Sequence, residues 1–223
     1  MGLRTRLLRA VLVLMFIGVA TLAVAGCANP GRSRDLGNPS IEAAVLAQQV
    51  CSNCHGMTGN AVSPNFPNLA GQVEPYVVAQ LNSFKSRNRH DPAGFEYMWG
   101  LSRSLTDKQI AGLAAYYAAQ SPQPSPQEGK VAQIEAGRLL FESGASDTQV
   151  PPCVGCHGPK GLGQGAFPRL AGQHADYVVK QLTGFQRTDD RPDGAVMKVV
   201  AHNLTAQNIV NVASYVQSLS GER

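Results

Sequence analysis

The sequence predicts an all-α protein that is built as two tandem domains, each made of a few short helices. Three observations support this fold class. Apolar residues recur at helical spacing in matching places of the two halves, and no stretch alternates convincingly enough to be a strand. A long sequence block also occurs twice, which indicates a duplicated domain rather than a solenoid of shorter units.

The first element, residues 1–26, has the pattern of an export signal. Arg4, Arg6 and Arg9 precede an uncharged run of 16 residues, Ala10 to Ala25. This run is shorter than the roughly 20 residues that span a bilayer, so a transmembrane anchor is the weaker alternative. We expect residues 1–26 to be a signal peptide and the mature chain to be periplasmic.

The motif Val24-Ala25-Gly26-Cys27 resembles a bacterial lipobox. The resemblance implies that Cys27 is acylated, becomes the first mature residue and holds the protein on a membrane surface. In such lipoproteins an Asp directly after the cysteine retains the protein at the inner membrane. Here Ala28 follows the cysteine, which favours an anchor in the outer membrane. Residues 27–40 then form a flexible linker. An ordinary secretory signal with a chance cysteine is the alternative.

The composition excludes several classes of protein. Hydrophobic residues make up 43% of the chain, too many for a disordered protein. The net charge is +4, and without residues 1–26 there remain 16 basic and 15 acidic residues. No basic patch or aromatic platform accompanies this charge, so we expect no nucleic-acid partner.

The repeat sets the predicted domain boundaries. Phe66 to Gln72 recurs 101 residues later as Phe167 to Gln173, and the segment from Tyr76 recurs from Tyr177. The segment between the halves alternates Pro with polar residues, which makes a stiff, extended linker. The predicted parts are therefore domain 1 at 41–120, the linker at 121–129 and domain 2 at 130–223.

Helix signals occupy equivalent places in both halves. Residues 41–54 and 133–143 are expected to form the first helices, and a middle helix is expected to begin at Pro75. Thr106, with Gln109 three residues later, predicts a capping box for the last helix of domain 1. Each half is small and rich in glycine loops, so we expect another group to fill its centre.

Four cysteines carry the strongest functional signal. Each half contains one Cys-x-x-Cys-His run, the attachment signature of haem c. Cysteines three residues apart share a helical turn, so both thiols reach the vinyl groups of one haem, and the next histidine faces the iron. We therefore expect two haem c groups and their iron. The residues are Cys51, Cys54 and His55, and Cys153, Cys156 and His157.

Three other interpretations of the cysteines are weaker. The two pairs are 98 residues apart, whereas paired zinc ligands usually lie about 15–20 residues apart. A thioredoxin-like redox pair needs a strand and helix that the sequence does not predict. Disulfides suit an exported protein, but they leave the two adjacent histidines unexplained.

The sixth iron ligand follows by elimination. Of five methionines, Met1 and Met15 are in the signal and Met57 is too close to His55. Met98 and Met197 remain, one in each half, each seven residues before the leucine that opens the last helix. Core packing is the alternative role for a methionine. The rival ligands have no histidine at the equivalent position and are interpreted as surface residues: His90, His174 and His202.

Two prolines and four arginines complete the candidate site. The backbone carbonyls of Pro67 and Pro168 are placed to accept the Nδ1 hydrogen of the proximal histidines, although a simple turn proline fits equally well. The arginines have two interpretations, as partners of haem propionates and, more strongly, as solvated surface residues. They are Arg87, Arg89, Arg187 and Arg191.

The chain from about Ile41 to Leu219 resembles a two-domain class I cytochrome c of the c-four type. The matching features are both Cys-x-x-Cys-His runs, the paired Phe-Pro-x-Leu-Ala-Gly-Gln segments, the two methionines and the final helices. The resemblance implies two cytochrome c folds that face each other, with haem propionates near the interface. It also implies electron delivery to a haem–copper terminal oxidase. The first helix of domain 1 departs from the pattern, because it lacks counterparts of Gly137 and Phe141, so its helix crossing is expected to differ.

The predicted function is a dihaem electron carrier, not an enzyme. Two occupied axial positions leave no open site for a substrate, and a methionine ligand raises the potential relative to a second histidine. The expected partners are a respiratory donor, such as a quinol-oxidising complex, and a terminal oxidase. One alternative is the electron-accepting subunit of a periplasmic dehydrogenase. A dihaem peroxidase or thiosulfate-oxidising enzyme is less favoured.

Overall fold

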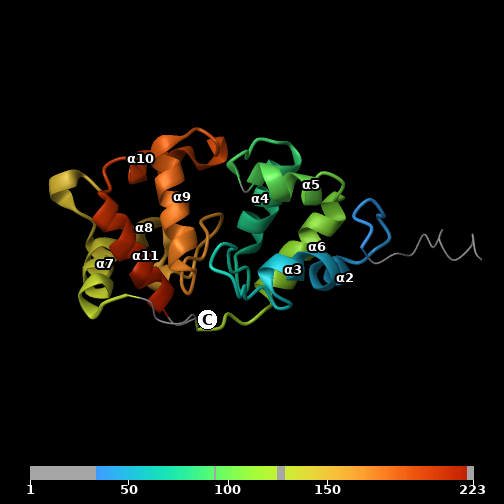
Figure 1. Ribbon diagram of the computed structural model, residues 1–223, viewed down its shortest axis with the longest axis horizontal. Helices are drawn as coiled ribbons and strands as arrows, with labels where there is room; N and C mark the ends of the chain where they lie inside the picture. The colour runs from blue at the N-terminus through green and yellow to red at the C-terminus, as the bar shows by residue number, and fades with distance from the viewer. Residues whose placement is uncertain (1–33, 93, 125–128, 220–223) are drawn as a thin grey trace, which may run out of the picture.

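The computed structural model describes residues 34–92, 94–124 and 129–219, and the regular structure in these ranges is helical (Figure 1). The bridges Ala145–Val150 and Gln164–Phe167 are isolated, so these ranges contain no strand. The all-α prediction is confirmed. The predicted signal, Cys27 and residues 125–128 of the linker lie outside the described residues. Within the described ranges, no helix has the length and apolar character needed to cross a membrane.

Domain 1 begins with three helical segments that follow one another without a break. The predicted helix over 41–54 is therefore present, but it runs from residue 43 to residue 55 and winds as a π-helix in its middle. The elements are α2 (Ala43–Leu46), the π-helix η1 (Ala47–Cys51), α3 (Ser52–His55), α4 (Glu74–Lys85), the π-helix η2 (Gly94–Met98), α5 (Trp99–Ser102) and α6 (Asp107–Ala118).

Domain 2 repeats this order with additional short 3₁₀ turns. The elements are α7 (Val131–Ser143), η3 (Ser146–Thr148), α8 (Val154–His157), η4 (Pro159–Gly161), α9 (Ala175–Arg187), η5 (Pro192–Gly194), α10 (Ala195–Ala201) and α11 (Ala206–Ser218). In both domains the last helix starts at a capping box. Thr106 accepts a hydrogen bond from the backbone N–H of Gln109, and Thr205 accepts one from that of Asn208.

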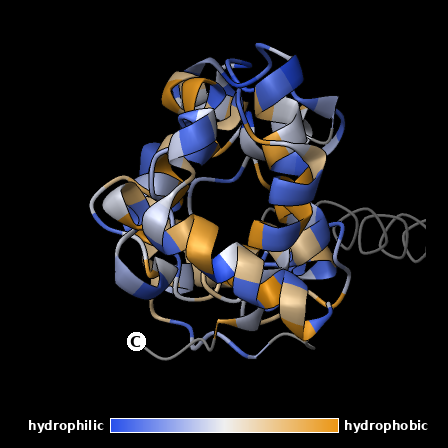
Figure 2. Ribbon diagram, turned by 90° about the vertical axis from the view of Figure 1, so that its left-hand side faces the viewer, coloured by the Kyte–Doolittle hydropathy of each residue, from blue (hydrophilic) through white to orange (hydrophobic). Residues whose placement is uncertain are grey.

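Each domain has its own apolar core. In domain 1, α2, η1 and α6 bury Leu46, Ile110 and Leu113. In domain 2, α7, α9 and α11 bury a larger set around Phe141 and Val216. The helices carry apolar residues on one side and hydrophilic residues on the other, so apolar and hydrophilic colours alternate along them in Figure 2. Burial against these cores, rather than helix propensity, stabilises such short helices.

The first and last helices approach each other closely at a different glycine in each domain. Gly137 of α7 lies against α11 so closely that a Cβ atom there would be 2.0 Å from the carbonyl oxygen of Asn211. In domain 1 the close contact uses a glycine of the last helix instead. A Cβ atom at Gly112 would lie 2.6 Å from the Cβ atom of Ala43. At this contact, the glycine that the first helix of domain 1 lacks is thus replaced by one on its last helix.

The two domains lie side by side, with α4 and α9 facing each other in the middle of the molecule (Figure 1). Gln80 and Gln181 of these helices share hydrogen bonds with Arg89 and Arg191 from both domains. The arginines also lie over equivalent rings, each 4.5 Å from the ring centroid of Phe84 or Phe185. The equivalent residues of the two domains therefore contact each other reciprocally, so the interface has approximate twofold symmetry.

Two surface assignments from the sequence are wrong. Arg89 is only 6% exposed and pairs with Asp91 at 2.7 Å. Burial alone would lower the pKa of Arg89, but the neighbouring Tyr177 and Asp91 outweigh it and raise that pKa. His174 is also buried, and its Nε2–H donates to the carbonyl of Ala61 in the other domain at 2.9 Å. Both residues are covered because the domains meet over them, which helical periodicity does not reveal.

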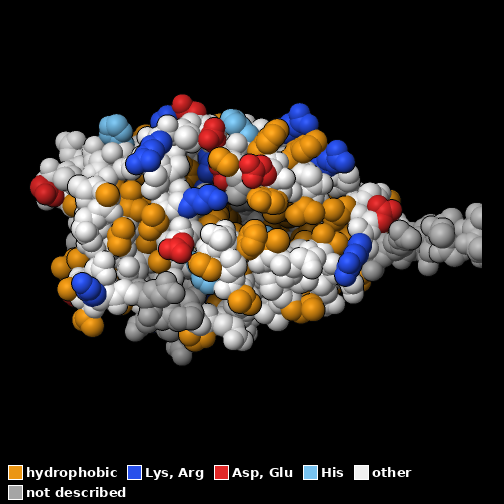
Figure 3. Space-filling model, viewed as in Figure 1, with side chains coloured by type: hydrophobic (Ala, Val, Ile, Leu, Met, Phe, Trp, Pro, Cys, Tyr) orange, Lys and Arg blue, Asp and Glu red, His pale blue; other side chains and the backbone are white. Residues whose placement is uncertain are grey.

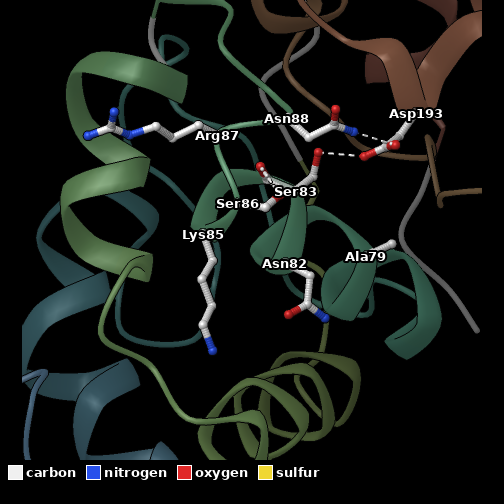
Figure 4. A pocket seen from close by; sticks show the side chains of 8 residues that line it. All are labelled: Ala79, Asn82, Ser83, Lys85, Ser86, Arg87, Asn88 and Asp193. Atoms are coloured by element: carbon white, nitrogen blue, oxygen red, sulfur yellow. Dashed lines mark hydrogen bonds between the residues drawn. The ribbon is translucent and has the colours of Figure 1, made fainter.

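An open hollow marks one edge of the interface (Figure 4). There Asp193 of domain 2 accepts hydrogen bonds from Ser83 at 2.5 Å and from Asn88 at 2.6 Å. The face shown in Figure 3 carries charges of both signs scattered among apolar side chains. A single-sign basic surface of the kind that binds nucleic acid is absent from that face.

Candidate haem sites

The last four residues of each Cys-x-x-Cys-His run form a short helix that stops at a glycine. α3 ends at His55 and α8 ends at His157, and the next residues, Gly56 and Gly158, have φ angles of +75° and +77°. A Cβ atom at Gly56 would lie 2.1 Å from the carbonyl oxygen of Asn60, so any side chain there would force the backbone turn at Asn60 to shift. The glycine turns the chain away and leaves the histidine as the last residue of its helix.

The cysteines of the two runs differ in their exposure to solvent. Cys51, Cys54 and Cys153 are half-buried, whereas Cys156 is exposed. Burial raises the pKa of the Cys51 thiol and raises that of Cys153 to about 11. In each run the two sulfur-bearing residues are one helical turn apart, which is the spacing that two thioether links to one haem require.

Both histidines are held by the backbone in the same way. Nδ1 of His55 lies 2.9 Å from the carbonyl oxygen of Pro67, and Nδ1 of His157 lies 2.9 Å from that of Pro168. A carbonyl oxygen only accepts, so Nδ1 carries the hydrogen and Nε2 of the neutral ring keeps its lone pair. Burial lowers the pKa of both histidines, which favours this neutral form. Each imidazole is therefore prepared to bind a metal through Nε2.

Phenylalanines of the repeat fix the histidine rings from the side. Phe66 packs edge-to-face against His55 with 6.2 Å between ring centroids, and Phe167 packs against His157 in the same way at 6.3 Å. Neither phenylalanine was predicted to have a role at the site. The sequence did contain an indication of this role. In both copies of the repeat, a Phe directly precedes the proline whose carbonyl accepts the hydrogen bond from the histidine.

This donor set fits haem c. Nε2 of neither histidine has a hydrogen-bond partner in the described ranges. Each buried ring ends a short helix that contains the second cysteine, and the first cysteine directly precedes that helix. Within the described residues, no three His, Cys, Asp or Glu side chains gather as metal ligands, as a zinc site would require. A haem held by two thioethers and one imidazole uses all the groups that each run offers.

Met98 and Met197 occupy equivalent places in the two folds. Met98 ends η2, which packs against α4, and its carbonyl accepts a hydrogen bond from Ser102 at 2.7 Å. Met197 lies in α10, which packs against α9, and it contacts the domain 2 core. Both are half-buried, whereas Met57 is 58% exposed. The rings of His55 and His157 lie in the same domains as Met98 and Met197 respectively.

Comparison with known proteins identifies relatives along most of the chain. The cytochrome c family profile matches residues 41–120 and 134–220. Cytochrome c-552 of Acidithiobacillus ferridurans is 38% identical over 90% of this chain and 85% of its own. Cytochrome c4 of Azotobacter vinelandii is 39% identical over 76% of this chain and 84% of its own. A thiosulfate dehydrogenase electron acceptor of Stutzerimonas stutzeri is 33% identical over 76% of this chain and 78% of its own.

Solved structures show the same two-domain arrangement. Cytochrome c4 of Acidithiobacillus ferrooxidans matches with a TM-score of 0.68 and 39% identity, covering 76% of this chain and 98% of that one. The thiosulfate dehydrogenase TsdBA of Marichromatium purpuratum matches with a TM-score of 0.65 and 31% identity. This match covers 85% of the present chain and 40% of that larger one.

Proposed function

Because the chain belongs to the cytochrome c family, as a dihaem protein of the c4 type with two covalent haem c groups, we propose that it carries single electrons on the periplasmic side, from a respiratory donor to a terminal oxidase. The observation that carries the proposal is the equivalence of the two sites. Both domains hold a buried neutral histidine in the same way, with Nδ1 on a prolyl carbonyl. The two domains also correspond in the positions of their Cys-x-x-Cys-His runs and of Met98 and Met197, which supports two sites of the same kind.

Each side chain has one role in this proposal. Bound haem supplies an iron that alternates between the ferrous and ferric states. The cysteines Cys51, Cys54, Cys153 and Cys156 hold it covalently, which keeps the group in an exported protein. His55 and His157 bind the iron through Nε2, and the carbonyls of Pro67 and Pro168 fix their orientation.

We assign the remaining axial position to Met98 and Met197. The contacts and exposure of the three other candidate histidines support this assignment. His174 donates from Nε2 to Ala61 of the other domain, and His90 lies at the surface with Nε2 3.5 Å from Asp190. His202 is exposed and has no equivalent in domain 1. With six ligands at each iron, the protein exchanges electrons without binding a substrate.

A redox titration with candidate partners tests the proposal. Reduced protein should be oxidised rapidly by a terminal oxidase from the same cell, and its spectrum should return unchanged after each cycle. Rapid reaction of the reduced protein with hydrogen peroxide, at a rate that depends on peroxide concentration, would contradict the carrier role and support a dihaem peroxidase.

A second candidate is the electron-accepting subunit of a periplasmic dehydrogenase. The similarity to a thiosulfate dehydrogenase electron acceptor, and to part of TsdBA, favours it. The two candidates differ in the electron donor. Stable copurification with a larger catalytic subunit, and reduction by thiosulfate only when that subunit is present, would support the second one.

We also propose that Cys27 is acylated and holds the protein on a membrane, with the outer membrane favoured by Ala28. The support is the position of Cys27 directly after the apolar run. Cys27→Ser should release a soluble protein with both haems, because the haem cysteines lie elsewhere in the chain. The spectrum should not change. A wild-type protein that is soluble and has a free Cys27 thiol would contradict this proposal.

A further inference from the structure

Two glutamines of the repeat reach across the domain interface in opposite directions. The side-chain amide of Gln173 accepts from the backbone N–H of Asn68 at 2.8 Å and donates to the backbone carbonyl of the same residue at 3.0 Å. Gln72 binds Arg169 in the same way, at 2.7 Å and 3.0 Å. Both glutamines are buried, and they are 101 residues apart, as are their targets.

These targets directly follow the prolines that hold the axial histidines. The carbonyl of Pro67 and the N–H of Asn68 belong to one peptide unit. This unit accepts from Nδ1 of His55 on one side and donates to Gln173 on the other. The peptide unit of Pro168 and Arg169 likewise joins His157 to Gln72. Each histidine is therefore connected through one peptide to a glutamine of the opposite domain.

We propose that Gln72 and Gln173 are crossed positioning residues, each tuning the haem of the domain to which it does not belong. A hydrogen bond accepted from a peptide N–H polarises that peptide and makes its carbonyl a stronger acceptor. A stronger acceptor at Nδ1–H makes the imidazole a more basic ligand, and a more basic ligand favours ferric iron. Gln173 thus lowers the potential of the domain 1 haem, and Gln72 lowers that of the domain 2 haem.

The chemistry of a primary amide suits this task. Its oxygen accepts from the N–H of the target residue and also from the N–H of the residue that follows the glutamine, while its nitrogen donates to the target carbonyl. A single side chain therefore satisfies both backbone groups of the target residue. A glutamate has no donor for the carbonyl and would bury a charge there. The alternative role for both glutamines is to hold the domains together without affecting either haem. The two roles differ in which haem responds when one glutamine is removed.

The experiment uses Gln173→Met and Gln72→Met in the full haem-loaded protein. Methionine is similar in length but makes neither hydrogen bond. Ser83→Ala is the matched control, because it removes a different interdomain hydrogen bond, to Asp193, that does not involve these peptides. The readouts are the two midpoint potentials and the Nδ1 proton signals of His55 and His157 in the reduced, ¹⁵N-labelled protein.

Gln173→Met should weaken the hydrogen bond of His55 and move its Nδ1 proton signal upfield, while that of His157 stays in place. The midpoint potential of the domain 1 haem should rise. The equilibrium constant for reduction of that haem should increase about twofold, since neighbouring hydrogen bonds strengthen each other by roughly 10–30%. For one electron, a twofold change is about 18 mV. Gln72→Met should affect His157 and the other midpoint, and Ser83→Ala should move neither.

The inference is overturned if either variant moves both histidine signals equally, moves only the histidine of its own domain, or moves neither. If a methionine variant does not fold with both haems, the corresponding Gln→Asn variant replaces it, because the shorter amide cannot close both hydrogen bonds. The inference rests on His55 and His157 as iron ligands. If the histidine signals lack the haem ring-current shift, the ligation itself is contradicted. If the shifts are intact but neither variant changes the histidine of the opposite domain, only the present inference is contradicted.

Discussion

At the scale of single residues, the methionines that we propose as axial ligands are expected to set the potential of each haem. Met98→His and Met197→His should keep the haem attached, because the cysteines and proximal histidine are untouched. The altered haem should fall in potential, since imidazole favours ferric iron more than a thioether does. The ferric sulfur-to-iron charge-transfer band should halve in each single variant and vanish in the double variant.

Met57→Leu is the matched control for these substitutions. Met57 is 58% exposed and lies two residues after His55, so its replacement should leave the charge-transfer band at full strength. A Met98→His or Met197→His variant that keeps the full band would show that the altered methionine packs the core and that another group binds the iron.

The glycine after each histidine gives a second prediction at this scale. Gly158→Ala places a side chain at φ +77° without a close contact, and it should lower the free energy of unfolding of domain 2 by about 1–2 kcal/mol. Gly56→Ala should cost more in domain 1, because its Cβ atom would also meet the carbonyl oxygen of Asn60 at 2.1 Å. Denaturant unfolding followed by circular dichroism measures both. Equal losses would mean that the Asn60 turn relaxes freely.

At the scale of elements, the crossing of the first and last helices depends on glycine in both domains. Gly137→Ala would bring a Cβ atom within 2.0 Å of the Asn211 carbonyl, so α7 and α11 must separate. We expect domain 2 to lose about 2–3 kcal/mol of stability, in the range of other overpacked cores. The midpoint of denaturant unfolding of domain 2 measures this loss.

Gly184→Ala is the control for that prediction. Gly184 lies inside α9, and no atom lies within 4 Å of a Cβ atom built there. Because alanine favours the helix over glycine by about 1 kcal/mol, this variant should be more stable than the wild type. If Gly137→Ala were also stabilising, the close approach of α7 and α11 would not constrain the fold.

At the scale of the whole molecule, a buried ion pair links the interface to pH. Burial alone would raise the pKa of Asp91, but the hydrogen bond and charge of Arg89 outweigh it and lower that pKa. A lowered carboxyl pKa contributes stability that is fully present above the unfolded value of about 3.9 and is lost as the pH falls through the folded value. The contribution of Asp91 to the stability of the interface should therefore be lost in acid.

Asp91→Asn tests this linkage. At pH 7 the variant should be less stable, by about 3 kcal/mol or less, because Arg89 keeps a buried charge without its carboxylate partner. Below pH 4 the wild type should lose this advantage, and the two curves of unfolding free energy against pH should converge. Parallel curves down to pH 2 would show that Asp91 does not supply the acid dependence.

Local sequence determined most of the helical framework. The capping boxes at Thr106 and Thr205, and the apolar stripe around Ile110 and Leu113, depend on residues within one or two turns of each other. Local patterns of this kind can be read without the fold. The haem c runs are equally local, because both cysteines and the histidine lie within five consecutive residues.

Only the tertiary structure decided which residues are buried and hydrogen-bonded at the interface between the domains. It buried Arg89 and His174, which the sequence placed on the surface, and it paired Gln72 and Gln173 with backbone groups about 100 residues away. Periodicity and caps report on a helix and its immediate neighbours. Burial of a polar side chain at an interface depends instead on a partner surface and on pairing of each hydrogen-bonding group, and both exist only once the two domains have met.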